Sequence, residues 1–338
     1  HLAACRHYNV GGKKMPRNAL VFCIACLVLS GVVMPTFAQN YPNRAVRIIA
    51  PFPPGGGLDI VARALGQKLA LELKQPVVID NRAGADGMIG SEQVARAAPD
   101  GYTLLVSSTG PMVINPALNA TMPYDTVKDF APITLVVVQP MFLVVHPSLP
   151  AKSVKELIAL AKARPGQLNY ASGGVGNGAH LAGEIFRSLT SIDIVHIPYK
   201  GAAPAVVDLL AGQAHMMLNS VSVLLPHINA GKLRALAVGA PHRMALLPNV
   251  PTMKEAGVAD FDASSWYGFF APAATPREIV ARLNTEAVKI LRSQEMRDYL
   301  EPQGAEPIGN TPEQFSAHIR AELAKWARAV KSAGVKPH

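Results

Sequence analysis

The sequence predicts an α/β protein with two domains, each built on a mainly parallel sheet flanked by helices, and two segments crossing between them. Three observations support this fold class. The chain has 338 residues, enough for about two domains of roughly 150 residues each. Apolar residues make up 49% and charged residues 16%, a composition that supplies a packed core and excludes a disordered chain. Short apolar runs alternate with helical patterns, as in sheets whose parallel strands are joined by helices.

The first series of strands and helices lies between residues 45 and 107. Its first helix carries Leu58, Val61, Leu65 and Leu69 on one face, at the spacing of an amphipathic helix. This alternation predicts a parallel sheet wrapped by helices. We expect strands at 45–50, 77–80 and 102–107, and helices at 58–74 and 87–97.

A second series begins near residue 141. Ser153 and Glu156 form a capping box that opens its first helix. Its strands are short, continuous apolar runs, which is typical of buried parallel strands. We expect strands at 141–146, 168–171, 194–198, 215–219 and 233–238, and further helices at 179–189, 202–211 and 221–230.

Two Thr-Pro pairs mark helix starts in the last quarter of the chain. Thr275-Pro276 with Glu278, and Thr311-Pro312 with Gln314, each combine an N-cap, a first-turn proline and an acid or amide at the third position. We expect these helices to return and cover the sheet of the first series. The first domain would then be discontinuous and the second continuous. The helices span about 276–292 and 312–332, the first domain 39–140 and 262–338, the second domain 141–261, and the crossings lie near 138–144 and 258–268.

Residues 1–38 are interpreted as an upstream extension followed by a cleaved export signal. A start at Met15 puts a basic residue ahead of an apolar run over 19–33, and small residues precede a cleavage site after Ala38. The run is shorter than the ~20 residues that span a membrane, which disfavours a transmembrane anchor. A lipoprotein attached through Cys26 lacks the expected preceding leucine. We expect an exported, soluble protein, periplasmic in a Gram-negative organism.

Charge and cysteine content exclude several classes of function. The net charge is +9, but residues 1–38 hold four basic side chains and no acid, so the rest carries +5 without a basic stripe. This distribution disfavours nucleic-acid binding. All three cysteines precede Ala38, which removes disulfides, cysteine metal ligands and thiol nucleophiles from the mature chain. His180 and Glu184 share a helix face without an evident third ligand, so we expect neither metal nor cofactor.

Glycine-rich loops follow the strands at the edge where open α/β sheets bind ligands. The loops at 51–59 and 81–87 in the first series and 171–178 in the second each enter a helix. Glycine lets a ligand approach the backbone, and the free N–H groups of a helix N-terminus favour an anion. One such loop from each domain, facing the other, predicts a clamshell that closes on one anionic ligand.

Each side chain in these loops also has a structural interpretation. Asp59 either caps its own helix or orients a ligand, and His180 fits a first-turn helix residue better than a ligand contact. Serines in turns are usually turn formers. Asp86 beside an anion site either points away or pairs with an ammonium group on the ligand. Trp266 is expected to pack between the domains rather than to stack on a ligand.

Five segments, taken in order, resemble the Bug family, the extracytoplasmic solute-binding receptors of tripartite tricarboxylate transporters. The resemblance covers about residues 40–335. It implies a two-domain periplasmic-binding-protein (clamshell) fold that binds a small carboxylate between its domains. The segments are PFPPGGGLD at 51–59, NRAG at 81–84, DGYTL at 100–104, PYKG at 198–201 and LPHI at 225–228.

The resemblance also implies a set of ligand-binding residues. Two positions depart from the family pattern: Asn219 stands where members often have an acid, and Asp86 stands where many have a small residue. The ligand itself therefore does not follow from the resemblance. The expected contacts are Phe52, Gly55, Gly56, Asp59, Arg82, Ala83, Gly84, Ser107 and Ser108 from the first domain, and Tyr170, Ser172, Gly173, Gly176, Asn177, His180 and Tyr199 from the second.

The function predicted from the sequence is that of a monomeric, non-catalytic receptor. It would capture a small carboxylate (a di- or tricarboxylate, an acidic amino acid or an aromatic acid) and present it to membrane transporter subunits. Two alternatives remain open. One is a periplasmic enzyme on the same fold, and the other is a ligand-dependent sensor adaptor that docks on a membrane kinase.

Overall fold

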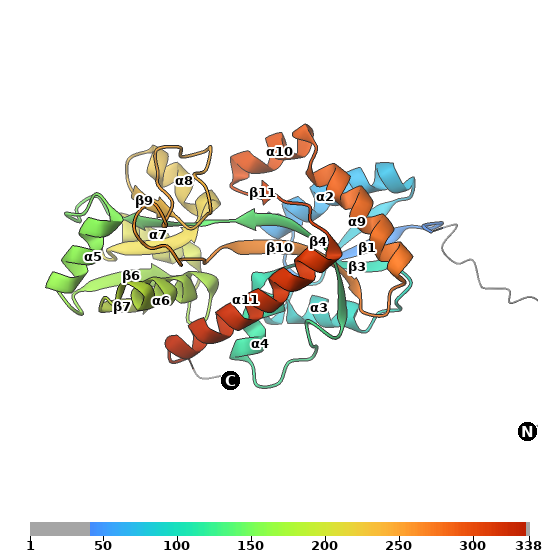
Figure 1. The fold of residues 1–338 in the computed structure, drawn as a ribbon, viewed down its shortest axis with the longest axis horizontal. Coiled ribbons are helices and arrows are strands. Elements are labelled where there is room, and N and C mark those ends of the chain that lie inside the picture. Colours follow the sequence, from blue (N-terminus) through green and yellow to red (C-terminus); the bar gives the residue numbers. More distant parts are fainter. Residues whose placement is uncertain (1–40, 336–338) are drawn as a thin grey trace, which may run out of the picture. The chain divides into compact units, whose positions relative to one another are not determined.

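The computed structural model describes residues 41–335, and two sheets organise this part of the chain (Figure 1). The predicted extension and export signal, with cleavage after Ala38 and all three cysteines, lie outside the described residues. The first sheet has the order β11-β4-β10-β3-β1-β2 and the second the order β7-β6-β8-β5-β9. The strands of the first sheet are β1 (Val46–Ala50), β2 (Val77–Asn81), β3 (Thr103–Ser108), β4 (Phe130–Gln139), β10 (Ser265–Pro272) and β11 (Glu306–Pro307); those of the second are β5 (Met141–Val145), β6 (Leu168–Ser172), β7 (Ile194–Pro198), β8 (Met216–Ser220) and β9 (Arg234–Val238).

Helices flank both sheets, and their bounds agree with the sequence-based expectations to within about two residues where a helix was expected. The short helices α4 and α10 were not expected. Within residues 41–335, none of the helices has both the length and the apolar character needed to cross a membrane. The α-helices are α2 (Gly57–Leu73), α3 (Met88–Ala95), α4 (Asn115–Leu118), α5 (Val154–Ala163), α6 (Gly178–Thr190), α7 (Ala202–Leu210), α8 (Val221–Asn229), α9 (Arg277–Leu291), α10 (Gln294–Leu300) and α11 (Pro312–Ser332), with 3₁₀ turns η1 (Ala85–Gly87) and η3 (Glu301–Gln303) and a π turn η2 (Gly110–Ile114).

In each sheet, a strand at the point where the chain crosses over runs against its neighbours, and in the first sheet β11 is also antiparallel to β4. β5 is antiparallel to β8 and β9, and β10 is antiparallel to β3 and β4. Only Pro140 separates β4 of the first sheet from β5 of the second. The chain leaves one sheet at the carboxyl ends of its parallel strands and enters the other sheet at the edge that faces it. The entering strand, β5 or β10, therefore runs in the direction opposite to the strands beside it. The strands joined by helices, β1 to β3 and β6 to β8, pair in parallel as predicted.

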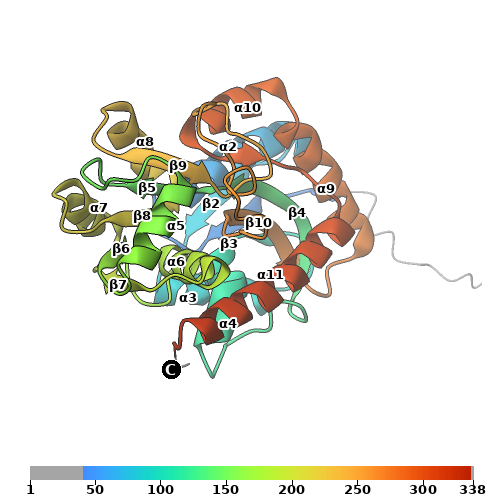
Figure 2. The ribbon, with the colours of Figure 1, turned by 60° about the vertical axis from the view of Figure 1, so that its left-hand side comes forward.

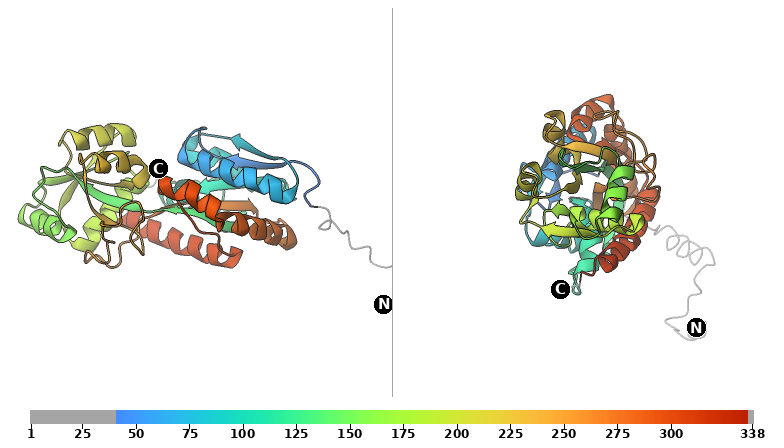
Figure 3. Two further views of the ribbon diagram at one scale, coloured as in Figure 1. Left: turned by 90° about the horizontal axis from the view of Figure 1, so that it is seen from above. Right: turned by 90° about the vertical axis from the view of Figure 1, so that its left-hand side faces the viewer.

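The C-terminal part of the chain returns to the first sheet, as predicted. β10 and β11 complete that sheet, and α9 and α11 pack against β4. α11 also contacts α6, beside the second sheet (Figure 2). The two sheets divide the chain at Pro140 and between 238 and 265, close to the predicted crossings, and Figure 3 shows the paired crossing segments from above. The domain boundaries themselves stay a prediction.

The two Thr-Pro pairs form different helix starts. Thr311 and Gln314 form a reciprocal capping box, in which the Thr311 hydroxyl accepts the Gln314 N–H and the Gln314 side chain accepts the Thr311 N–H. The N-cap predicted at Thr275 is wrong, because Pro276 occupies that position and the buried Thr275 hydroxyl has no hydrogen-bond partner. The Thr275 N–H bonds to Pro272 O at 3.0 Å, so Thr275 belongs to the turn that ends β10.

Candidate functional site

A cavity of about 160 Å³, hereafter the cavity, lies between loops of the two sheets. Its walls come from the loops that follow β1, β2, β3 and β6, and from the first residues of the crossing strands β5 and β10. This is the edge at which open α/β sheets bind ligands. Its lining residues are Phe52, Asp86, Ser108, Thr109, Gly110, Ile114, Met141, Gly176, Asn177, Gly178, Ser264, Ser265 and Trp326.

Two larger hollows lie elsewhere, and none of the predicted binding loops lines them. One of about 490 Å³ is lined by α6 and α11, and one of about 760 Å³ by the starts of α9 and α11. In the described part of the chain, no three His, Cys, Asp or Glu side chains are placed to hold a metal ion. The cavity is therefore the place where the predicted binding loops meet around a hollow.

The structure brings four of the predicted ligand-binding residues to the cavity wall: Phe52, Ser108, Gly176 and Asn177. The other twelve surround these loops without lining the cavity, and their contact with a ligand stays a prediction. They are Gly55, Gly56, Asp59, Arg82, Ala83, Gly84, Ser107, Tyr170, Ser172, Gly173, His180 and Tyr199.

A stack of three rings holds the loop of the second sheet. The Gly176 N–H donates to His180 Nδ1 at 3.0 Å, and the His180 ring stacks on His196 with centroids 3.9 Å apart. His196 stacks in turn on Tyr170 at 4.9 Å, and its Nε2 lies 2.7 Å from the Ser172 hydroxyl. Burial lowers the pKa of both histidines, and the adjacent His180 helps to bring the pKa of His196 to about 4. The neutral His180 ring can then accept the glycine N–H.

Tyr170 belongs to the support of this loop and not to the cavity wall. Its side chain is fully buried, and its hydroxyl donates to Glu184 Oε1 at 2.6 Å. Arg187 pairs with the other oxygen of Glu184, with Nε 2.9 Å away. Burial, together with the hydrogen bond to Glu184, raises the pKa of Tyr170. The sequence predicted Tyr170 but missed its partner His196, which only the β6–β7 register brings opposite it.

Asp59 holds the loop of the first sheet. Its Oδ2 accepts the Gly55 N–H at 2.8 Å and Arg63 Nε at 2.9 Å, while Oδ1 accepts Asn81 Nδ2 at 2.9 Å. Burial acts to raise the pKa of this carboxyl, but the hydrogen bonds from Arg63, Gly55 and Asn81 outweigh it and the pKa is lowered. Asp59 is thus a charged brace, and its side chain is only 4% exposed.

The remaining predicted side chains have partners of their own. Arg82 pairs with Asp80 at 3.1 Å, and the Tyr199 hydroxyl donates to Asp208 at 2.7 Å. The buried Ser107 hydroxyl lies 3.4 Å from that of Ser91. These contacts fix the loops around the cavity.

The loop after β2 is held in an uncommon backbone conformation. Gly84, Ala85, Asp86 and Gly87 all have positive φ, at 136°, 45°, 49° and 84°. A non-glycine residue in this region costs roughly 1–2 kcal/mol, and such strain tends to persist at functional sites. A Cβ on Gly87 would lie 3.1 Å from the Phe52 ring, so this loop and the loop after β1 support each other at the cavity.

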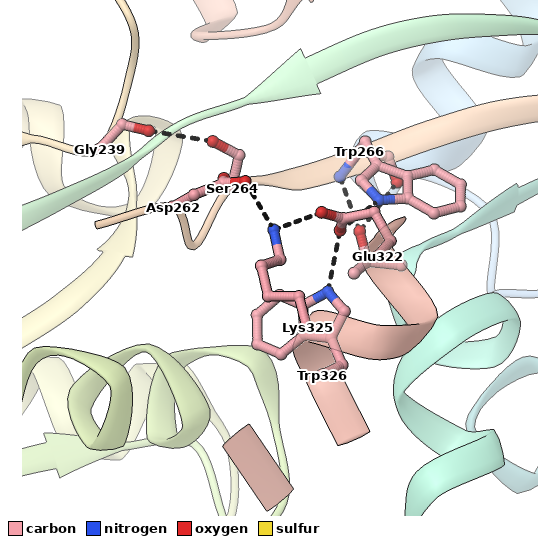
Figure 4. Close-up of polar contacts among 8 residues, drawn as sticks. Gly239, Asp262, Ser264, Trp266, Glu322, Lys325 and Trp326 are labelled. Carbon is pink, nitrogen blue, oxygen red and sulfur yellow. Dashed lines mark hydrogen bonds and ion pairs between the residues drawn. The ribbon is translucent and has the colours of Figure 1, made fainter. Parts of the chain in front are cut away.

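The C-terminal helix forms a further wall, which the sequence did not predict. Trp326 of α11 lines the cavity, and Glu322 Oε2 accepts the indole N–H of both Trp326 and Trp266 at 2.9 Å (Figure 4). Lys325 pairs with the other oxygen of Glu322 and, at 3.0 Å, with Asp262. Trp266, at the start of β10, is buried in a core shared by both sheets, as the sequence predicted. The network ties the second crossing segment to the wall.

Two helix-flanked sheets, two crossing segments and one cavity at facing carboxyl edges define a two-lobed solute-binding protein of the periplasmic-binding-protein type. Comparison with known proteins specifies it further. Residues 61–335 match the family described as the tripartite tricarboxylate transporter family receptor, and the chain belongs to this family. The predicted resemblance to Bug receptors is confirmed, and the members of this family are receptors and not enzymes.

Individual relatives cover nearly the whole chain. Protein BugT of Bordetella pertussis is 41% identical over 311 residues, which are 92% of this chain and 95% of BugT. A solved R. palustris structure with adipate is 38% identical with a TM-score of 0.75, covering 88% of this chain and all of that one. MatC from Rhodopseudomonas palustris, with bound malate, is 32% identical with a TM-score of 0.69 and covers 86% of this chain and all of its own. These similarities confirm the predicted clamshell fold.

Proposed function

We propose that this protein is an exported, monomeric receptor that binds a small carboxylate in the cavity and presents it to the membrane subunits of a tripartite tricarboxylate-type transporter. The observation that carries the proposal is the position of the cavity, between the loops of two sheets in a chain of this receptor family. The solved relatives with adipate and malate support a carboxylate as the ligand. The predicted export signal supports a periplasmic location.

The N-terminus of α6 supplies the anion-binding element of this proposal. Asn177 caps the helix by accepting the His180 N–H at 2.8 Å. Among the described residues, the N–H groups of Gly178 and Ala179 have no acceptor, and Gly178 lines the cavity. Free donors at the start of a helix favour a carboxylate.

The first test is a ligand screen on protein purified from the periplasm, unfolded and refolded to remove any bound compound. Thermal shifts would be recorded with dicarboxylates, tricarboxylates, amino acids and aromatic acids. A ligand at 100 times its Kd stabilises the folded state by about 2.7 kcal/mol, which raises Tm by several degrees. Recovery of the compound unchanged supports a receptor, whereas its consumption would move the enzyme ahead. Mass spectrometry of the same sample identifies the mature N-terminus.

A charge substitution at the α6 cap tests the anion site directly. Asn177→Asp keeps a good capping residue but adds a negative charge at the cavity wall. We expect the Kd of the carboxylate found in the screen to rise at least tenfold, measured by calorimetry, with Tm changed little. Ser153→Asp makes the matching change at the cap of α5, outside the cavity, and should leave Kd unchanged. Equal affinities in both variants would contradict the proposed site.

A further inference from the structure

The cavity has one charged side chain in its wall, and that charge is negative. Asp86 is the only acidic or basic residue among those that line it. The polar atoms of the other lining side chains belong to serine and threonine hydroxyls, the Asn177 amide and the Trp326 indole, whose N–H is already bonded to Glu322. No lysine, arginine or histidine in the described chain forms an ion pair with Asp86. The wall therefore offers an anion the N–H donors of the α6 N-terminus but no positively charged side chain.

The backbone fixes the position of this carboxylate. Asp86 lies in the left-handed region (φ 49°, ψ 42°) inside the strained turn that follows β2. Its carbonyl accepts Asn115 Nδ2 at 3.4 Å, and its Oδ2 lies 3.3 Å from where a Cβ on Gly110 would be. The residue is exposed as a whole, yet enough of the chain surrounds the carboxyl that burial raises its pKa. A cation placed beside it would relieve that cost by stabilising the ionised form.

The two electrostatic elements of the cavity come from different sheets and have opposite preferences. The α6 N-terminus, after β6, favours a negative group, whereas Asp86, after β2, favours a positive one. A ligand that spans the cavity and carries both charges would satisfy both elements. A plain dicarboxylate would place a second negative charge on the side of the cavity where Asp86 lies.

We propose, building on the function proposed above, that the natural ligand is an ammonium carboxylate such as an amino acid, with its carboxylate at the N-terminus of α6 and its ammonium group paired with Asp86. Asp86 is then a specificity-determining residue that selects against ligands carrying only negative charge.

The test compares acids that differ only in an amino group. Calorimetry would measure Kd for the pairs aspartate and succinate, glutamate and glutarate, and alanine and propionate. In at least one pair we expect the amino compound to bind the native protein at least tenfold more tightly. In Asp86→Asn this preference should disappear, because the amino compound weakens and the plain acid strengthens.

Two further variants make the result interpretable. Asp86→Gly also removes the charge and suits a left-handed position, so it should match Asp86→Asn even if one of the two folds poorly. Glu92→Gln removes a carboxylate from α3, where Glu92 pairs with Arg96 outside the cavity, and should keep the native preference.

The outcomes separate this inference from the function on which it rests. If plain acids bind the native protein as tightly as their amino counterparts, or if both Asp86 variants keep the preference, the inference is wrong while the carboxylate receptor stands. If no compound of these pairs or of the wider screen binds, the proposed function fails and the inference fails with it.

Discussion

The two glycine-rich loops share one local design but differ in what supports them. In each, a side chain from the first turn of the following helix accepts the N–H of a glycine four residues earlier. Asp59 accepts the Gly55 N–H at 2.8 Å, and His180 accepts the Gly176 N–H at 3.0 Å. The first brace is an ion that pairs with Arg63, whose side chain is 52% exposed, and the second is a neutral ring inside a buried stack.

The two glycine-rich loops have the same local hydrogen-bond pattern, yet they contribute differently to the cavity. The first loop contributes Phe52 to the cavity wall, but of the residues at the two helix starts only those of α6 line the cavity. At the start of α2, a Cβ on Gly57 would be 3.0 Å from the Tyr267 hydroxyl on the crossing strand β10. Asp86, from the loop after β2, lines the same cavity as the α6 N-terminus. Equal glycine loops therefore do not imply equal roles.

The largest expected effect on stability comes from removing the two supporting side chains, Asp59 and His180. Asp59→Ala leaves the Gly55 N–H without its acceptor, and the Asn81 amide keeps only its hydrogen bond to the Phe52 carbonyl, so the change should cost about 3 kcal/mol of stability in urea unfolding. Because neither Asp59 nor Gly55 lines the cavity, ligand affinity should stay within about threefold. His180→Ala should cost about 2 kcal/mol and also weaken binding at least tenfold, since Gly176 lines the cavity. A tenfold loss of affinity in Asp59→Ala would show that the hydrogen bonds of Asp59 help to position the binding site.

A pair of glycine substitutions sharpens the comparison at smaller cost. Gly55 and Gly176 have similar φ values, +85° and +80°, so alanine at either should cost roughly 1–2 kcal/mol in backbone strain. A Cβ on Gly176 would lie 2.9 Å from Leu118 Cδ1, whereas nothing lies within 4 Å of one on Gly55. We therefore expect Gly176→Ala to lower Tm further and to weaken ligand binding.

Gly55→Ala is the matched control, with the same strain and no steric clash. Equal Tm and equal Kd in the two variants would mean that contact with Leu118 does not position the second loop.

Local signals predicted much of the fold and only part of the site. Periodicity and capping placed the helices and the helix-linked strands, because those patterns depend on neighbours in the chain. Two strands of the first sheet, β4 and β10, were missed: β4 contains Pro132 and runs into β5 without a turn signal, and β10 lacks apolar alternation at Gly268. The cavity residues Ser264, Ser265 and Trp326 come from a crossing and a distant helix. Tertiary packing alone brings them to the loops that the motifs revealed.

The pH dependence of stability should distinguish the two braces. The pKa of His196 falls from an ordinary 6.5 to about 4 on folding, so the unfolded chain binds the proton more readily. The stability that the neutral stack contributes is therefore complete above pH 6.5 and is lost as pH falls toward 4. Asp59, whose pKa is lowered from 3.8, should lose its contribution only at still lower pH.

The measurement is Tm between pH 7 and pH 4 for the native protein, His196→Gln and the control His227→Gln. Replacing His196 removes a group that the unfolded state protonates in this range, so Tm of that variant should fall less steeply between pH 6.5 and 4. The control changes a histidine in the last turn of α8, away from the stack, and should follow the native curve. If all three curves are parallel, protonation of the stack does not limit the stability of the second loop, and the two braces differ in structure but not in their response to acid.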